Sequence, residues 1–343
     1  MGSIEMHATK WIFSLVVVSA LVACGSDETA PAPAQPEAQP QPAATAPPAA
    51  DNRIAATAAE VAAEARGDVT CPADTGAPPD PQAPVADIVG VRPGMTYEQA
   101  ANIVMCTDDL MVVSDPVARG FEIQTYGQTV RQGFEAALAE DRINKTSKEI
   151  MAEMQDSAMA RGTNRAMDRN AMHGKVSWFV GTMGLPGQEV VISAARESWF
   201  PDGKQPTMES VGQALIDKYG APTKDSLVEG GSQVGPSRHL TWAFDPFGRP
   251  ITETSPLFGQ CSAPSSPDAG VNLSPDCGVA IAAQITALHD NPGLVEVMSV
   301  GMVDQANGFE AITATEQGFE AMEQARRAAE SQEAAKNADA PVL

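Results

Sequence analysis

The sequence is poor in the residues that enzymes commonly use for acid–base and metal chemistry. It contains four histidines in 343 residues, and aromatic residues make up only 5%. Zinc motifs of the HExxH or CxxC type, phosphate-binding loops and dinucleotide fingerprints do not occur. Gly181, Gly184 and Gly187 follow a predicted strand, but a second strand rather than a helix comes next, which indicates a hairpin turn. We therefore expect no catalytic residues, no metal and no cofactor.

Basic residues and long apolar runs are also scarce. The chain has 22 Lys and Arg against 44 Asp and Glu, which gives a net charge of −22. Such a chain has no general electrostatic attraction to nucleic acid or anionic lipid, so we expect no nucleic-acid partner. None of its apolar runs reaches the roughly 20 residues that a transmembrane helix needs.

One shorter apolar run lies near the N-terminus. Residues 11–23 fit the 7–15 residues of a signal-peptide core. Lys10 supplies the positive flank, and either Met1 or Met6 is a possible start. The run ends in Leu21-Val22-Ala23-Cys24, which resembles the lipobox of bacterial lipoproteins. The resemblance implies that 1–23 is a signal peptide, that Cys24 is lipidated, and that the chain is anchored in the outer membrane on its periplasmic face.

Residues 24–70 are predicted to be a Pro/Ala-rich tether after the lipidated cysteine, disordered in its first part, while the alanine-rich stretch 51–67 favours a short helix. Residues 30–50 contain seven Pro and nine Ala, a composition that favours extended polyproline geometry over a packed core. At roughly 3.1 Å per residue this stretch reaches on the order of 65 Å. The folded part is therefore expected to stand well away from the membrane.

The four remaining cysteines suggest two disulfides, because an exported chain folds in an oxidising compartment. Four cysteines allow three connectivities. We favour Cys261–Cys277, because the residues between them are turn formers, and Cys71–Cys106 then pairs by elimination.

Residues 71–310 are predicted to be an α+β region of antiparallel hairpins with packed helices, followed by a C-terminal helix and frayed tail at 311–343. Helices are expected after the capping residues Thr96 and Pro206-Thr207, and hairpins at 176–198 and 278–303. The pattern Pro-x-Met recurs at 93–95 and 206–208, which hints at two related helix–hairpin units.

Three motifs in these units resemble envelope lipoprotein domains of the BamE type and the related β-lactamase-inhibitor-like fold. They are Gly94-Met95-Thr96-Tyr97-Glu98-Gln99, then Leu215 to Pro222, and Trp242 to Gly248. The resemblance covers about 60 residues in two separated pieces. It implies a helix packed on an antiparallel sheet.

A helical insert is expected between the units, at about 131–175. It carries 8 basic and 7 acidic residues, so it is the one region that is not acidic. Arg161, Arg165 and Arg169 recur at i, i+4 and i+8, which places them on one helix stripe. We read this stripe as either a solvated face or a docking surface for an acidic envelope partner. The insert also holds five methionines beside His173, and at this spacing they indicate core packing rather than soft-metal ligation.

Two functional hypotheses follow. The first is a non-enzymatic, lipid-anchored binding or scaffold module of the envelope. The alternative is a periplasmic hydrolase with an unrecognised site, which a cleft holding a carboxyl group of strongly raised pKa would favour.

Overall fold

A computed structural model describes residues 53–67, 69–72, 84–114, 121–152, 154, 169, 172–231, 234–267 and 269–338. The expected signal peptide, the lipidation site Cys24 and most of the tether lie outside these ranges. Of the helices within them, none combines the length and apolar character needed to cross a bilayer.

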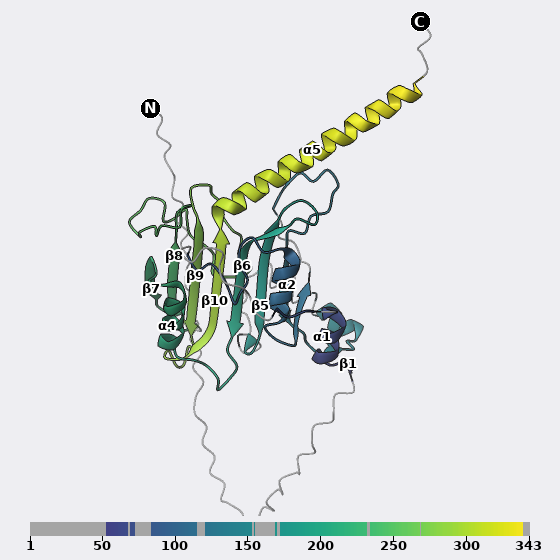
Figure 1. Ribbon diagram of the computed structural model, residues 1–343. Coiled ribbons are helices and arrows are strands. Elements are labelled where there is room, and N and C mark those ends of the chain that lie inside the picture. The colour runs from purple at the N-terminus through teal and green to yellow at the C-terminus, as the bar shows by residue number, and fades with distance from the viewer. Residues whose placement is uncertain are drawn as a thin grey trace, which may run out of the picture. The chain divides into compact units, whose positions relative to one another are not determined.

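An eight-stranded antiparallel sheet forms the centre of the described region, in the order β2-β3-β5-β6-β10-β9-β8-β7 (Figure 1). Its strands are β2 Met111–Ser114, β3 Gly133–Leu138, β5 Val176–Met183, β6 Val190–Trp199, β7 Lys224–Val228, β8 Ser237–Ala243, β9 Val279–Ala287 and β10 Val295–Asp304. A separate two-stranded sheet joins β1 Ile54–Ala56 to β4 Arg142–Ile143. The predicted α+β class with antiparallel hairpins is confirmed.

Helices begin where the sequence offers capping residues. Thr96 and Gln99 form a reciprocal capping box at the start of α2 Tyr97–Met105, and Thr207 caps α4 Met208–Tyr219. Thr57 and Glu60 form another box in front of α1 Ala58–Arg66. The C-terminal helix α5 spans Gln305–Asn337, so it starts six residues before the expected boundary at 311.

The sheet divides into two units with the same internal order. The first unit contains α2 and β2, β3, β5 and β6; the second contains α4 and β7, β8, β9 and β10. Each helix cap pairs with the start of the last strand of its own unit, Thr96 with Val190 and Thr207 with Leu294. Thr96 and Thr207 therefore occupy equivalent positions in the two units. When these threonines are aligned, the two Pro-x-Met motifs lie two residues out of register with each other.

The last strands of the two units, β6 and β10, support the same equivalence between the units. The pairing of β5 with β6 skips Ile192, and the pairing of β9 with β10 skips Glu296, so both final strands carry a bulge at the equivalent place. Adding 104 to a β6 number gives its β10 equivalent, because 190 + 104 = 294 and 192 + 104 = 296. Arg196 therefore corresponds to Val300, and these two residues are direct partners across the seam between β6 and β10.

Two disulfides close loops at the edges of this region. Cys71 bonds Cys106 at the end of α2, and Cys261 bonds Cys277 in front of β9. Both predicted pairings are confirmed. Cys261 and Cys277 are completely buried and form a small core of their own with Ile251.

The predicted helical insert at 131–175 is wrong in its first part. Residues 133–138 form β3, which pairs with β2 and β5 inside the main sheet. Phe134 and Ala136 alternate into the core, so sheet pairing overrides the helix propensity of this alanine-rich stretch. Later in the insert, Thr146 and Glu149 form a capping box, and residues 147–152 are helical.

Candidate functional site

A pocket of about 450 Å³ lies between α4 and the two central strands of the sheet. Its walls are mostly apolar and come from the segment before α2, from α4 and from β6 and β10; they include Ile88, Phe200, Val211, Leu215, Met298 and Val300. The pocket has the size and apolar lining that are typical of small-molecule sites. It also lies at the seam between the two units.

Arg196 supplies a positive charge to this apolar pocket. Its strand alternates, so that Ala194 and Arg196 point to the helix-covered face. The guanidinium lies 5.6 Å from the ring centre of Trp178, its cross-strand neighbour. Its buried Nε has no hydrogen-bond partner, and no carboxylate of the described residues forms an ion pair with it. Burial lowers the pKa of Arg196, because desolvation disfavours the charged form.

The other titratable groups of the pocket are already paired. Lys218 lies 2.8 Å from Asp87 Oδ1, and the Tyr219 hydroxyl donates to the Asp87 carbonyl at 2.8 Å. Burial and the nearby Asp87 charge raise the pKa of Tyr219, so the phenol stays neutral. These contacts fasten the end of α4 to the segment before α2. Arg196 is therefore the one pocket side chain with an uncompensated charge among the described residues.

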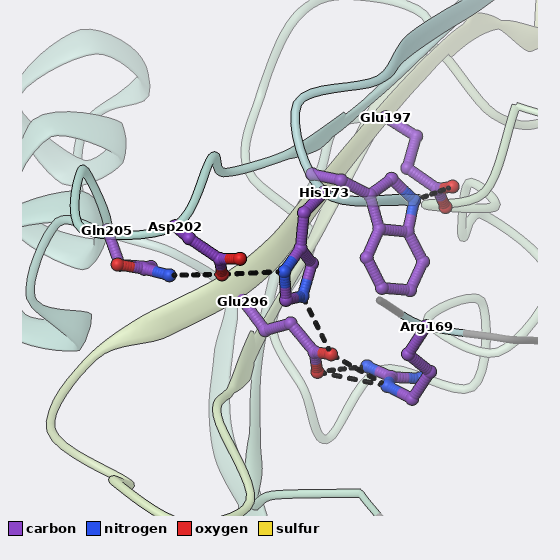
Figure 2. Close-up of polar contacts among 7 residues, drawn as sticks. Arg169, His173, Glu197, Asp202, Gln205 and Glu296 are labelled. Carbon is purple, nitrogen blue, oxygen red and sulfur yellow. Dashed lines mark hydrogen bonds and ion pairs between the residues drawn. The ribbon is translucent and has the colours of Figure 1, made fainter. Parts of the chain in front are cut away.

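A polar cluster lies elsewhere, around the bulge residue Glu296 (Figure 2). Arg169 binds the Glu296 carboxylate through Nε, 3.0 Å from each oxygen, and through Nη2 at 2.5 Å. Its guanidinium lies 4.8 Å from the ring centre of Trp199. His173 Nδ1 lies 2.8 Å from Asp202 Oδ1, while its Nε2 lies 3.5 Å from Glu296 Oε1.

The geometry of this cluster suits a structural clasp better than a catalytic dyad. In a hydrolase the second ring nitrogen of such a histidine faces a nucleophile. Here the Nε2 atom of His173 faces Glu296, whose carboxylate is already bound by Arg169. Nε2 itself is buried and makes no hydrogen bond. The cluster joins Arg169 and His173 to β10 and to the loop after β6.

The predicted docking stripe is only partly described. Arg161 and Arg165 lie outside the described residues. Arg169 is not free for an outside partner, because its guanidinium is bound to Glu296. Among the methionines, Met151 and Met154 are 65% and 63% exposed, so the prediction that they fill a core is wrong.

Sequence reasoning missed both the pocket and the cluster. Arg196 did leave a signal, because it is a lone cation in the apolar strand VVISAARESW. Glu296 left none, since its burial depends on a bulge and on a partner more than a hundred residues away. In the described part of the chain, groups of three or more His, Cys, Asp or Glu that could hold a metal ion do not occur.

Comparison with protein-family models, with curated proteins and with solved structures gave no match for this chain.

Proposed function

We propose that this chain is a non-enzymatic, lipid-anchored binding module of the bacterial envelope, and that the pocket beside Arg196 is its ligand site. The uncompensated guanidinium in an apolar pocket is the observation that supports a binding role most directly. A buried polar group without a partner lowers stability. A ligand that satisfies Arg196 would remove this cost.

The anchoring part of the proposal depends on the sequence. Leu21-Val22-Ala23-Cys24 supplies the lipobox, and Gly25 favours the outer membrane with the folded region on the periplasmic side. The two disulfides suit an oxidising compartment such as the periplasm. A relation to BamE-type or β-lactamase-inhibitor-like domains belongs to this proposal as well.

The alternative, a periplasmic hydrolase, has weaker support. The contact between His173 and Asp202 is the feature that favours it, but Glu296 occupies the position where a nucleophile would lie. Six carboxyl groups in the described ranges have displaced pKa values, and each is lowered rather than raised: Glu60, Glu98, Glu149, Asp225, Asp245 and Glu323. A general acid at neutral pH needs a raised value.

Membrane fractionation of Cys24→Ala tests the anchor. We expect the wild type to partition with the outer membrane and into detergent, and the variant to accumulate as an uncleaved, unlipidated precursor. Cys71→Ala combined with Cys106→Ala is the matched control, because it removes a disulfide from the folded region, creates no free thiol and leaves the lipobox intact. Lipidation of the Cys24→Ala variant would contradict the proposal.

Crosslinking in cells tests the binding role. A photoreactive amino acid at the exposed Val89, at the rim of the pocket, should capture a ligand or partner for identification by mass spectrometry. The same amino acid at the exposed Leu227 on the sheet edge is the control. Equal capture at both positions would contradict a ligand site at the pocket.

A further inference from the structure

We infer that the pocket binds an amphiphilic carboxylate, an unbranched apolar chain whose terminal carboxylate pairs with Arg196. The inference rests on the proposed binding function and names the chemical class of the ligand. It combines three properties of the pocket: its charge, its size and its position between the two units.

The charge of the pocket selects an anion with a single negative charge. Lys218 and Asp87 form an ion pair at 2.8 Å and compensate each other, which leaves the charge of Arg196. A guanidinium presents a planar fork of donors that matches the two oxygens of a carboxylate. Pairing would also restore a partner to the buried Nε. A neutral head group could accept a hydrogen bond from this donor, but it would leave the charge of the guanidinium uncompensated, and a cationic head group would be repelled.

The walls of the pocket select an apolar chain behind that head group. Phe200, Val211, Leu215 and Met298 present hydrocarbon and one thioether to its interior. At about 30 Å³ for each water-sized group, a volume of 450 Å³ holds on the order of 15 non-hydrogen atoms. Dodecanoate has twelve carbons, including that of the carboxylate, and two oxygens. Its size therefore matches the pocket volume.

The duplication explains why one such pocket forms at the seam. Arg196 and its repeat equivalent Val300 are paired across the seam, so the approximate two-fold axis that relates the units passes between them. An arginine occurs on one side of this axis and a valine on the other. A ligand there contacts the first unit through Ile88 and Arg196, and the second through α4 and β10. Pockets between structural units are frequent ligand sites.

Photolabelling with two matched probes tests the inference. The full-length protein, purified and transferred from detergent to an amphipathic polymer, is illuminated with a diazirine analogue of dodecanoate or of dodecanol. Labelled peptides are then mapped by mass spectrometry. We expect the acid analogue to label peptides of α4 and β10 at least tenfold more than the alcohol, and unlabelled dodecanoate to compete.

Two variants separate the charge from the fold. Arg196→Met keeps the length and apolar contacts of the side chain, and it should abolish the preference for the acid while labelling by the alcohol persists. Arg196→Lys should retain part of the preference. Arg238→Met is the control, because Arg238 is paired with Asp225 at 2.6 Å outside the pocket. Circular dichroism confirms that each variant is folded.

Equal labelling by the acid and the alcohol in the wild type, or an unchanged preference in Arg196→Met, would overturn the inference. Labelling of other regions alone would overturn it as well. These outcomes are independent of the proposed function. Membrane fractionation and crosslinking at Val89 test that function, and neither experiment uses the dodecanoate or dodecanol probe.

Discussion

At the scale of single residues, Arg196 is a position where desolvation of a charge lowers stability and no ion pair among the described residues compensates for it. Its guanidinium is desolvated on the helix-covered face of β6 and contacts the ring of Trp178, which compensates a cation only weakly. A residue selected for stability at this position would be apolar, as Val300 is at the equivalent place. The arginine is therefore better explained by binding than by folding.

Arg196→Met should leave stability unchanged or raise it, by up to about 2 kcal/mol, because it removes an unpaired and partly buried charge and keeps the packing. Denaturant unfolding of the protein without added ligand measures the change. Arg238→Met breaks a partly exposed ion pair instead and should lower stability by less than about 1 kcal/mol. A clear loss of stability in Arg196→Met would show that the arginine has a structural partner.

Glu296 gives the opposite case, a buried charge with full compensation. Its side chain is 7% exposed and accepts hydrogen bonds from Arg169. Glu296→Gln should destabilise the protein by about 1–3 kcal/mol, because it leaves Arg169 without its carboxylate. Glu140→Gln is the control: the pair of Glu140 with Lys175 is exposed and should contribute less than about 0.5 kcal/mol. Equal unfolding free energies for the two variants would contradict the structural role of the clasp.

At the scale of elements, the sequence predicts those parts whose signals are local. The capping residues Thr96 and Thr207 locate α2 and α4, and the turns at Pro186 and Pro292 locate the two central hairpins. The strand β3 is missed, because alanine-rich residues near 136 favour a helix until β2 and β5 pair with them. The pairing that makes β3 a strand joins residues far apart in the sequence, so local sequence patterns do not predict it.

The disulfide between Cys261 and Cys277 holds a connection that has little regular structure. Its sequence separation is 16, for which the chain-entropy model gives a stabilisation of about 3 kcal/mol. Replacing both cysteines with serine should lower the free energy of unfolding by that order, and burial of two hydroxyl groups in a site without exposure adds to the loss. Peptide mapping without reduction checks the pairing. Recovery of both cysteines as free thiols in the wild type would contradict it.

In the second half of α5, two arginines form ion pairs with the buried Glu323. Hydrogen bonds from Arg326 and then Arg327 lower the pKa of Glu323 to about 2, from an ordinary value of 4.5. Because the folded value is the lower one, the stabilisation is complete above pH 4.5 and is lost as the pH falls toward 2. Carboxyl NMR shifts should show Glu323 titrating near 2 in the wild type and near 4.5 in Arg326→Ala/Arg327→Ala. An unchanged value in the double variant would refute the assignment.

At the scale of the whole molecule, the two units meet edge to edge and share one core. The sequence offers the Pro-x-Met repeat as a hint of this arrangement, but the motif is out of register with the true equivalence of Thr96 and Thr207. The order of the strands across the seam depends on pairing between β6 and β10, which local patterns do not encode. For the same reason the pocket, which needs both units, could not be located from the sequence.

This arrangement predicts that the units stay associated after the connection between them is cut. A protease site inserted between Gly203 and Lys204 lies in an exposed turn between β6 and α4. After cleavage, β6 and β10 should still be held by their continuous ladder from Val297 to Val303 and by buried residues on both sides, including Ala194 and Met302. An isolated unit would instead expose its last strand as an apolar edge.

Size-exclusion chromatography after cleavage checks this. Both fragments should elute together at the volume of the intact chain and separate only when urea is added, because the association depends on burial rather than on a covalent link. Retained labelling of the cleaved protein by the acid probe would further show that the seam keeps its geometry. Elution of two separate folded fragments in native buffer would mean that each unit is complete alone, and that the duplication is a tandem of independent domains.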